Sequence, residues 1–115
     1  MNRNTLLIVD DVEINRIILR SLFEDTYNIL EAGNGEQALM LLHQYTDTIA
    51  AVLLDIVMPV KSGYEVLEDM KSCGILDRIP VVVIIDRDCA QDEVRAFDLG
   101  ASDLITKPID SHVAG

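Results

Sequence analysis

The chain is poor in cysteine and has no long apolar segment. Its two cysteines, Cys73 and Cys89, have a spacing that matches no metal-binding pattern, and we interpret them as reduced thiols of a cytoplasmic protein. No apolar stretch approaches the length that spans a membrane. The apolar run after Arg3 is also too short for a secretory signal peptide. We therefore expect a cytoplasmic protein without a membrane partner.

Basic residues are scarce as well. Nine lysines and arginines stand against twenty aspartates and glutamates, which gives a formal net charge of −11 over 115 residues. Because nucleic-acid binding depends on basic side chains at phosphates, we expect no direct nucleic-acid partner. An acidic balance alone indicates only solubility, but here several acidic residues stand where predicted strands end. The length and the lack of repeats indicate one domain.

The clearest strand is the unbroken apolar segment that ends at Asp55. Such a run is typical of a strand buried on both faces. Pro59 follows soon afterwards and cannot continue a sheet ladder. Asp55 is therefore predicted where a buried strand gives way to a loop, at the edge where open α/β sheets bind ligands. Taken alone, the aspartate fits a cap of the following turn equally well.

Strand and helix patterns alternate along the whole chain. The expected strands are residues 5–9, 28–32, 50–54, 81–85 and 103–106. The expected helices are residues 12–25, 36–45, 64–73 and 91–99. This alternation predicts an α/β fold with a doubly wound, five-stranded parallel sheet and helices on both faces.

Apolar spacing also predicts which helix residues are buried. In helix 12–25 the residues expected to face the core are Ile14, Ile17, Ile18 and Leu22. Arg16 lies between them in the sequence and is expected to face solvent. Val94 and Phe97 are expected to face inward from helix 91–99, and Met40 is expected in the core.

Three predicted strands end in charged residues. Asp10 and Asp11 follow the first strand, Asp55 the third and Lys107 the fifth. Parallel strands end along one edge, and crowded carboxylates repel one another unless a cation intervenes. Since Mg²⁺ prefers carboxylate oxygens, we infer an Mg²⁺ site in which one carboxylate can attack phosphorus beside a lysine. The alternatives are that Asp10 and Asp11 cap the next helix and that Lys107 is a surface lysine.

Three short segments in this order resemble the response-regulator receiver domain of two-component signalling, the CheY-like family. They are Asp10-Asp11, Asp55-Ile56-Val57-Met58-Pro59 and Lys107-Pro108. Residues 9–16 and 100–103 are similar too, so the resemblance covers residues 5–109. Each motif is weak alone, whereas the ordered set is specific. The resemblance implies a flavodoxin-like fold with strand order 2-1-3-4-5.

The resemblance also implies roles for individual residues. Asp55 would be the phosphoacceptor of a sensor histidine kinase or a histidine phosphotransfer protein. Asp11, Asp55 and the backbone carbonyl of Val57 would bind Mg²⁺, with Asp10 in support. Lys107 would pair with the Asp55 carboxylate and later with the phosphoryl group. Such a domain assists its own phosphorylation and dephosphorylation but is not an enzyme in the ordinary sense.

The chain departs from the family pattern at the end of its fourth expected strand and within its fifth. The family usually has Ser or Thr where Ile85 stands and a small residue where Asp86 stands. It often has an aromatic switch residue in place of Leu104. We also expect residues 1–115 to be a receiver domain truncated at the start of its last helix. An output domain would then be missing, and an uncovered apolar face would favour homo-oligomers.

These departures keep other functions open. The chain could be an atypical receiver that acts as a phosphorylation-independent protein-interaction module, which a measurement of phosphoryl uptake would reveal. A phosphohydrolase resembling the haloacid dehalogenases would need an acid two residues after Asp55, where Val57 stands. A flavodoxin-like FMN carrier would need phosphate-binding amides in its first loop, where Asp10 and Asp11 would repel phosphate.

Overall fold

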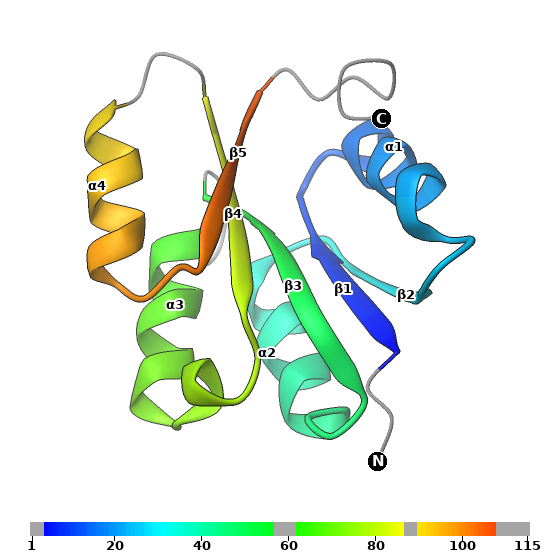
Figure 1. Cartoon of the computed structure of the whole chain (residues 1–115), viewed down its shortest axis with the longest axis horizontal. Helices are drawn as coiled ribbons and strands as arrows, with labels where there is room; N and C mark the ends of the chain where they lie inside the picture. The colour runs from blue at the N-terminus through cyan, green and yellow to red at the C-terminus, as the bar shows by residue number, and fades with distance from the viewer. Residues whose placement is uncertain (1–3, 57–61, 87–89, 108–115) are drawn as a thin grey trace.

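The computed structural model describes residues 4–56, 62–86 and 90–107, and of residues 86, 90–93, 106 and 107 it describes the backbone. Strands and helices alternate along these ranges (Figure 1). The strands are β1 (Thr5–Val9), β2 (Asn28–Ala32), β3 (Ile49–Asp55), β4 (Val81–Asp86) and β5 (Asp103–Lys107). The helices are α1 (Glu13–Phe23), α2 (Gly35–Gln44), α3 (Gly63–Ser72) and α4 (Ala90–Asp98), with a 3₁₀ helix η1 (Ile75–Asp77).

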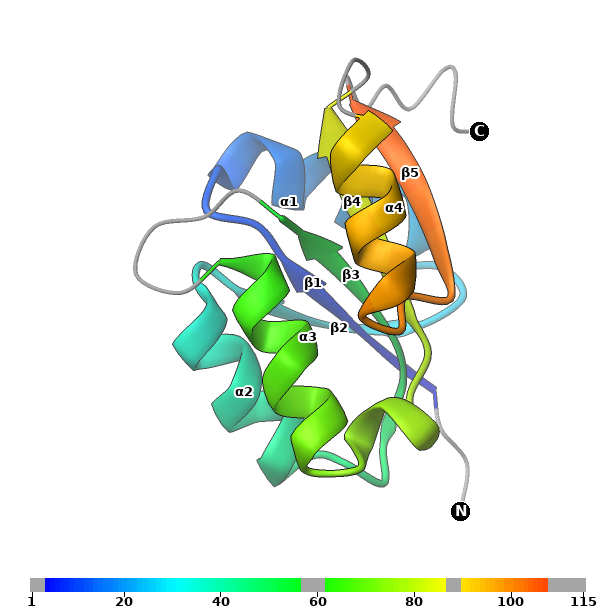
Figure 2. The same ribbon diagram turned by 90° about the vertical axis from the view of Figure 1, so that its left-hand side faces the viewer.

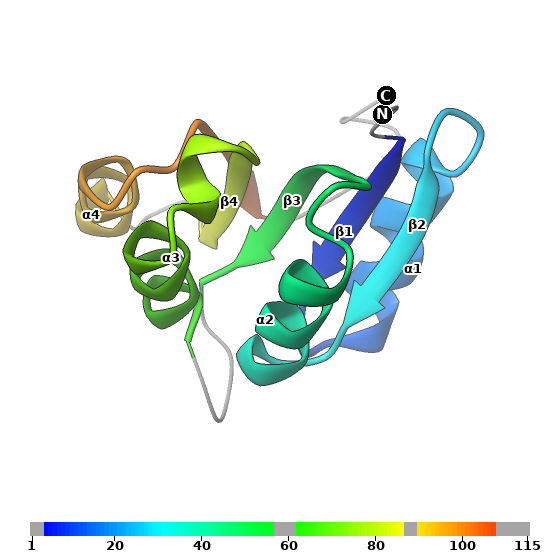
Figure 3. The ribbon, with the colours of Figure 1, turned by 90° about the horizontal axis from the view of Figure 1, so that it is seen from below.

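The five strands form one parallel sheet in the order β2-β1-β3-β4-β5, which confirms the predicted doubly wound α/β fold. Helix α1 lies on one face of the sheet, and α2, α3 and α4 lie on the other (Figures 2 and 3). From β1 the chain first moves outward to β2 and then returns through β3 to β4 and β5. The reversal between β1 and β3 is the switch point at which such sheets bind ligands.

The two faces of the sheet carry separate apolar clusters of unequal size. The larger cluster packs the strands against α2, α3 and α4, and its helical members include Ala38, Leu42, Val66, Leu67, Met70 and Ala96. The smaller cluster lies under α1 and consists of the buried residues Leu6, Ile8, Leu19, Leu53 and Ile84. Because both faces are buried, the strands are apolar at successive positions instead of at alternate ones.

Helix α1 is turned about its axis relative to the prediction. Ile14 and Ile17 are 58% and 40% exposed, and Leu19 is the buried residue of the helix. Arg16 is half-buried, because its guanidinium bonds to groups at the end of β1 and on β2. The prediction that Ile14 and Ile17 face the core and Arg16 faces solvent was therefore wrong.

The predicted inner residues of α4 are also exposed. Val94 and Phe97 are 62% and 45% exposed, while the small Ala96 packs against the large cluster. Met40 on α2 is exposed as well. An alanine lets the helix backbone approach the sheet closely, which leaves its bulkier neighbours outside.

The predicted boundaries lie within two residues of those observed, which is the usual uncertainty of helix ends. The 3₁₀ helix after Gly74 was not predicted. Within the described residues, no helix has both the length and the apolar character that a membrane crossing requires. The expected truncation concerns residues 108–115, which lie outside the described residues.

Candidate metal centre at the edge of the sheet

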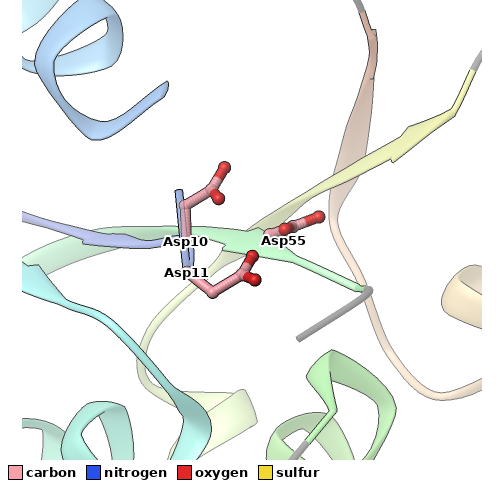
Figure 4. Close-up of side chains that lie close together, drawn as sticks. All are labelled: Asp10, Asp11 and Asp55. Atoms are coloured by element: carbon pink, nitrogen blue, oxygen red, sulfur yellow. The ribbon is translucent and has the colours of Figure 1, made fainter. Parts of the chain in front are cut away.

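Three aspartates meet at the carboxyl ends of β1 and β3 (Figure 4). Asp10 and Asp11 follow β1 directly, and Asp55 is the last residue of β3. Val9 pairs with Leu54, so Asp10 is level with Asp55 on the neighbouring strand. One carboxylate oxygen from each aspartate lies within 4.8 Å of the other two. The structure thus brings together the three carboxylates that the sequence places at strand ends.

The two oxygens of the Asp10 carboxylate lie in different environments. Its Oδ1 accepts a hydrogen bond of 2.9 Å from the backbone N–H of Val12, where α1 begins. This bond closes a turn before α1 and does not cap the helix, because Val12 is the N-cap residue and no side chain caps α1. Its Oδ2 is buried and has no hydrogen-bond partner among the described residues. A buried carboxylate oxygen without a donor is costly unless a cation or proton satisfies it.

The donor set fits a hard divalent cation. Asp10 and Asp55 are 0% and 1% exposed, whereas Asp11 is exposed. Mg²⁺ typically takes one or two protein carboxylates and keeps several waters, and the exposed side at Asp11 leaves room for them. The fourth predicted ligand, the carbonyl of Val57, lies outside the described residues.

Helix α3 begins in direct contact with the end of β3. The Gly63 N–H donates a hydrogen bond of 2.9 Å to the Ile56 carbonyl. A Cβ atom on Gly63 would lie 2.5 Å from the Asp55 carbonyl oxygen and 2.7 Å from the Ile56 Cα. Only glycine permits this approach, so α3 supports the main chain of Asp55. The sequence offers no signal for this role, because glycine is common just before a helix.

The next residue links α3 to α4. Tyr64 is buried, and the guanidinium carbon of Arg95 in α4 lies 3.9 Å from the centre of its ring. This distance is typical of a cation–π contact. The start of α3, next to Asp55, is thereby in contact with α4.

A half-buried arginine on α1 supports the other side of the centre. The Nη1 atom of Arg16 donates a hydrogen bond to the carbonyl oxygen of Asp10, and its Nε donates to Glu31 on β2. Arg20 binds the same glutamate. The sequence signal that could have revealed this cluster is Glu31 itself, an acidic residue in the middle of a short strand.

The ends of β4 and β5 differ from this acidic cluster. Ile85, next to the last residue of β4, is buried. Leu104 lies near the start of β5, opposite Val83, and is half-buried against the large cluster. In the strand pairing Ile85 lies opposite Thr106, and Asp86 lies opposite Lys107. The backbone of Lys107 therefore ends β5 at the same edge of the sheet as Asp55. The side chains of Asp86 and Lys107 lie outside the described residues.

A parallel sheet of this order, with an acidic cluster at its switch point, defines the class of CheY-like α/β domains. The family model of the response regulator receiver domain matches residues 6–113, and the chain belongs to that family. It is thus a receiver domain of two-component signalling. Among solved structures, the chemotaxis protein CheY4 of Vibrio cholerae has a TM-score of 0.86 at 19% identity, with 98% of this chain and 93% of that chain covered. At this identity the likeness supports the fold alone.

Curated relatives are longer than this chain. A probable cyclic di-GMP phosphodiesterase of Vibrio cholerae is 39% identical over 95% of this chain and 24% of its own length. The probable transcriptional regulator ycf29 of Pyropia yezoensis is 30% identical over 96% of this chain and 49% of its own length. The response regulator PleD of Caulobacter vibrioides is 36% identical over 91% of this chain and 23% of its own length. The chain thus spans less than half of each of these relatives.

Proposed function

We propose that this receiver domain is a phosphoacceptor switch in which Asp55 takes a phosphoryl group from a histidine kinase or a histidine phosphotransfer protein. The observation that carries the proposal is the cluster of Asp10, Asp11 and Asp55, with a buried Asp10 oxygen that lacks a donor among the described residues. Asp11, Asp55 and the Val57 carbonyl would hold Mg²⁺, and Asp10 would support it. When bound, Mg²⁺ neutralises negative charge on the phosphoryl group during transfer.

The residues of the chain have separate tasks in this reaction. The Asp55 carboxylate is the nucleophile, and the main chain of Asp55 is packed closely against Gly63 at the end of a buried strand. As its oxygen forms a bond to phosphorus, the phosphorus–nitrogen bond of the phosphohistidine donor breaks, and the imidazole leaves with the electron pair. Asp10 keeps Oδ1 on the Val12 N–H and so has only Oδ2 for the cation. Lys107 pairs with the transferred group.

In this proposal, the response to phosphorylation is carried out by another domain or protein. Relatives named as a transcriptional regulator and as a cyclic di-GMP phosphodiesterase are more than twice as long as the segment they share with this chain. We propose that phosphorylation at Asp55 alters a surface of the receiver domain that such an output unit contacts.

A second candidate is a protein-interaction module that works without phosphorylation. Ile85 favours it, because a buried isoleucine stands where the family usually has a serine or threonine hydroxyl. An apolar side chain there cannot bond to a phosphoryl oxygen. In this case the acidic cluster would be a remnant that still binds a cation.

Phosphoryl uptake separates the two candidates. The protein is incubated with acetyl phosphate and Mg²⁺, and its intact mass is measured. We expect one phosphoryl adduct that maps to Asp55, no adduct in Asp55→Asn, and less adduct in Asp11→Ala because a cation ligand is lost. The control Asp47→Asn changes a surface aspartate that pairs with Arg78 and should leave uptake unchanged. A folded protein without any adduct would favour the second candidate.

A further inference from the structure

Arg16 joins the main chain of the metal centre to strand β2. Its Nη1 atom donates a hydrogen bond of 2.6 Å to the carbonyl oxygen of Asp10. Its Nε atom donates one of 3.2 Å to Oε1 of Glu31. Both side chains are half-buried, and the carboxylate of Glu31 is shared with Arg20, whose Nη1 lies 3.1 Å from Oε2.

The carbonyl that Arg16 binds belongs to the peptide unit between the two aspartates of the centre. The turn around it is also fixed by the Asp10 N–H, which donates to the Ala32 carbonyl at 3.1 Å, and by the Val12 N–H on Asp10 Oδ1. These two bonds hold Asp10. The bond from Arg16 acts on the peptide that leads to Asp11, so it sets the direction in which that exposed side chain leaves the strand.

We propose that Arg16 is a positioning residue of the metal centre, which fixes the peptide between Asp10 and Asp11 so that both carboxylates stay beside Asp55. The inference rests on the proposed function, because this task exists only if the aspartates bind a cation. The guanidinium suits it, since its planar fork holds the carbonyl and Glu31 at the same time in a fixed geometry. A lysine ammonium carries its charge at one point and cannot span both groups equally well.

The test is the affinity of the folded chain for Mg²⁺, measured by calorimetry. We expect Arg16→Met to weaken Mg²⁺ binding about tenfold, the lower end of the range for partners that orient metal ligands. Arg16→Lys should recover part of the loss, because one donor to the Asp10 carbonyl can be rebuilt. The matched control is Arg20→Met, which removes a partner of Glu31 from the same helix but no bond to the Asp10 carbonyl. Its affinity should stay within about twofold of the parent chain, as is usual for exposed ion pairs.

A second readout does not involve the cation. Amide hydrogen exchange at Asp11 and Val12 in the metal-free chain should be faster in Arg16→Met and unchanged in Arg20→Met. A merely structural role for Arg16 would lower the free energy of unfolding and leave the Mg²⁺ affinity of the folded chain unchanged. If Arg16→Met does not fold, Glu31→Gln replaces it. That variant keeps the arginine but weakens the ion pair that holds it, so we expect a smaller loss of Mg²⁺ affinity. An Mg²⁺ affinity equal to that of the parent chain would overturn the inference.

The outcomes distinguish the two proposals. A parent chain that does not bind Mg²⁺ would overturn the proposed metal centre and this inference together. Binding by the parent with equal affinity in Arg16→Met, or an equal loss in Arg20→Met, would overturn only the positioning role of Arg16.

Discussion

The edge of the sheet that carries the candidate site has two halves that differ in their described side chains. At the ends of β1 and β3, three aspartates lie together and are held by backbone contacts from α1 and α3. Near the carboxyl ends of β4 and β5, the described side chain is the apolar Ile85, and Leu104 lies further back, near the start of β5. The acidic half has the carboxylates that would bind a cation and accept the phosphoryl group in the proposed function. Among the described side chains of the apolar half, none can donate a hydrogen bond to that group.

The difference indicates that accepting a phosphoryl group and transmitting its presence depend on different parts of the edge. A ligand shifts a two-state equilibrium only through contacts that differ between the states. A hydrogen bond to a charged group contributes about 1.5–3 kcal/mol, and a typical allosteric coupling energy is about 1–3 kcal/mol. Without a hydroxyl at Ile85, one contact of that size is missing. We therefore expect phosphorylation to change the acidic half strongly and α4 weakly.

The largest effect is expected where the acidic half is most tightly packed. In Gly63→Ala the new Cβ would lie 2.5 Å from the Asp55 carbonyl oxygen and 2.7 Å from the Ile56 Cα. Because these are main-chain atoms, α3 or the end of β3 must move, and we expect a loss of about 1–3 kcal/mol in the free energy of unfolding. Phosphoryl uptake should fall with it. Urea unfolding and the mass assay measure the two effects.

Gly33→Ala is the matched control, at the loop that follows β2. Its Cβ would lie 3.5 and 3.6 Å from side-chain atoms of Gln37 and Arg16, which are ordinary contacts. The free energy of unfolding should change by less than about 0.5 kcal/mol, as is usual at sites without tight packing. Equal stability of the two variants would show that close packing does not hold Asp55.

A smaller effect is expected from giving the apolar half a hydrogen-bond donor. In Ile85→Thr the hydroxyl can bond to a phosphoryl group, so loading with beryllofluoride, a phosphoryl mimic, should change the amide shifts of residues 94–99 more than in the parent chain. Ile85→Val removes a similar amount of apolar volume without adding a donor. It should cost about 0.5–1.5 kcal/mol in stability and leave the shifts small. Large shifts of α4 in the parent chain would contradict the proposed division of the edge.

The smallest effect is expected at Leu104. Leu104→Tyr adds the aromatic ring that the family often has there, but it adds no bond to a phosphoryl group. Since Leu104 is only half-buried, we expect stability to change by less than about 1 kcal/mol and the α4 shifts to grow less than in Ile85→Thr. Leu104→Met conserves volume and should leave the shifts unchanged. If the α4 amide shifts grew more in Leu104→Tyr than in Ile85→Thr, the aromatic ring would matter more for the response of α4 than the hydrogen-bond donor.

The strand ends were predictable because a sheet buried on both faces needs continuous apolar segments, and charged residues interrupt them visibly. Asp10, Asp11 and Asp55 could therefore be placed at one edge without coordinates. The rotation of α1 was not predictable, because apolar spacing treats Arg16 as a solvent-facing residue and ignores its partners on β1 and β2. Likewise the close approach of Gly63 depends on tertiary packing that no local pattern encodes.

The contact between Arg95 and Tyr64 gives the molecule an intrinsic optical label. The chain has three tyrosines and no tryptophan, so its near-ultraviolet emission comes from tyrosine alone. Tyr64 follows Gly63, the glycine that packs against the main chain of Asp55, and the guanidinium of Arg95 in α4 lies over its ring. With Tyr27 and Tyr45 replaced by phenylalanine, the remaining fluorophore would sense any separation of α3 from α4 through quenching and lifetime, without an attached dye.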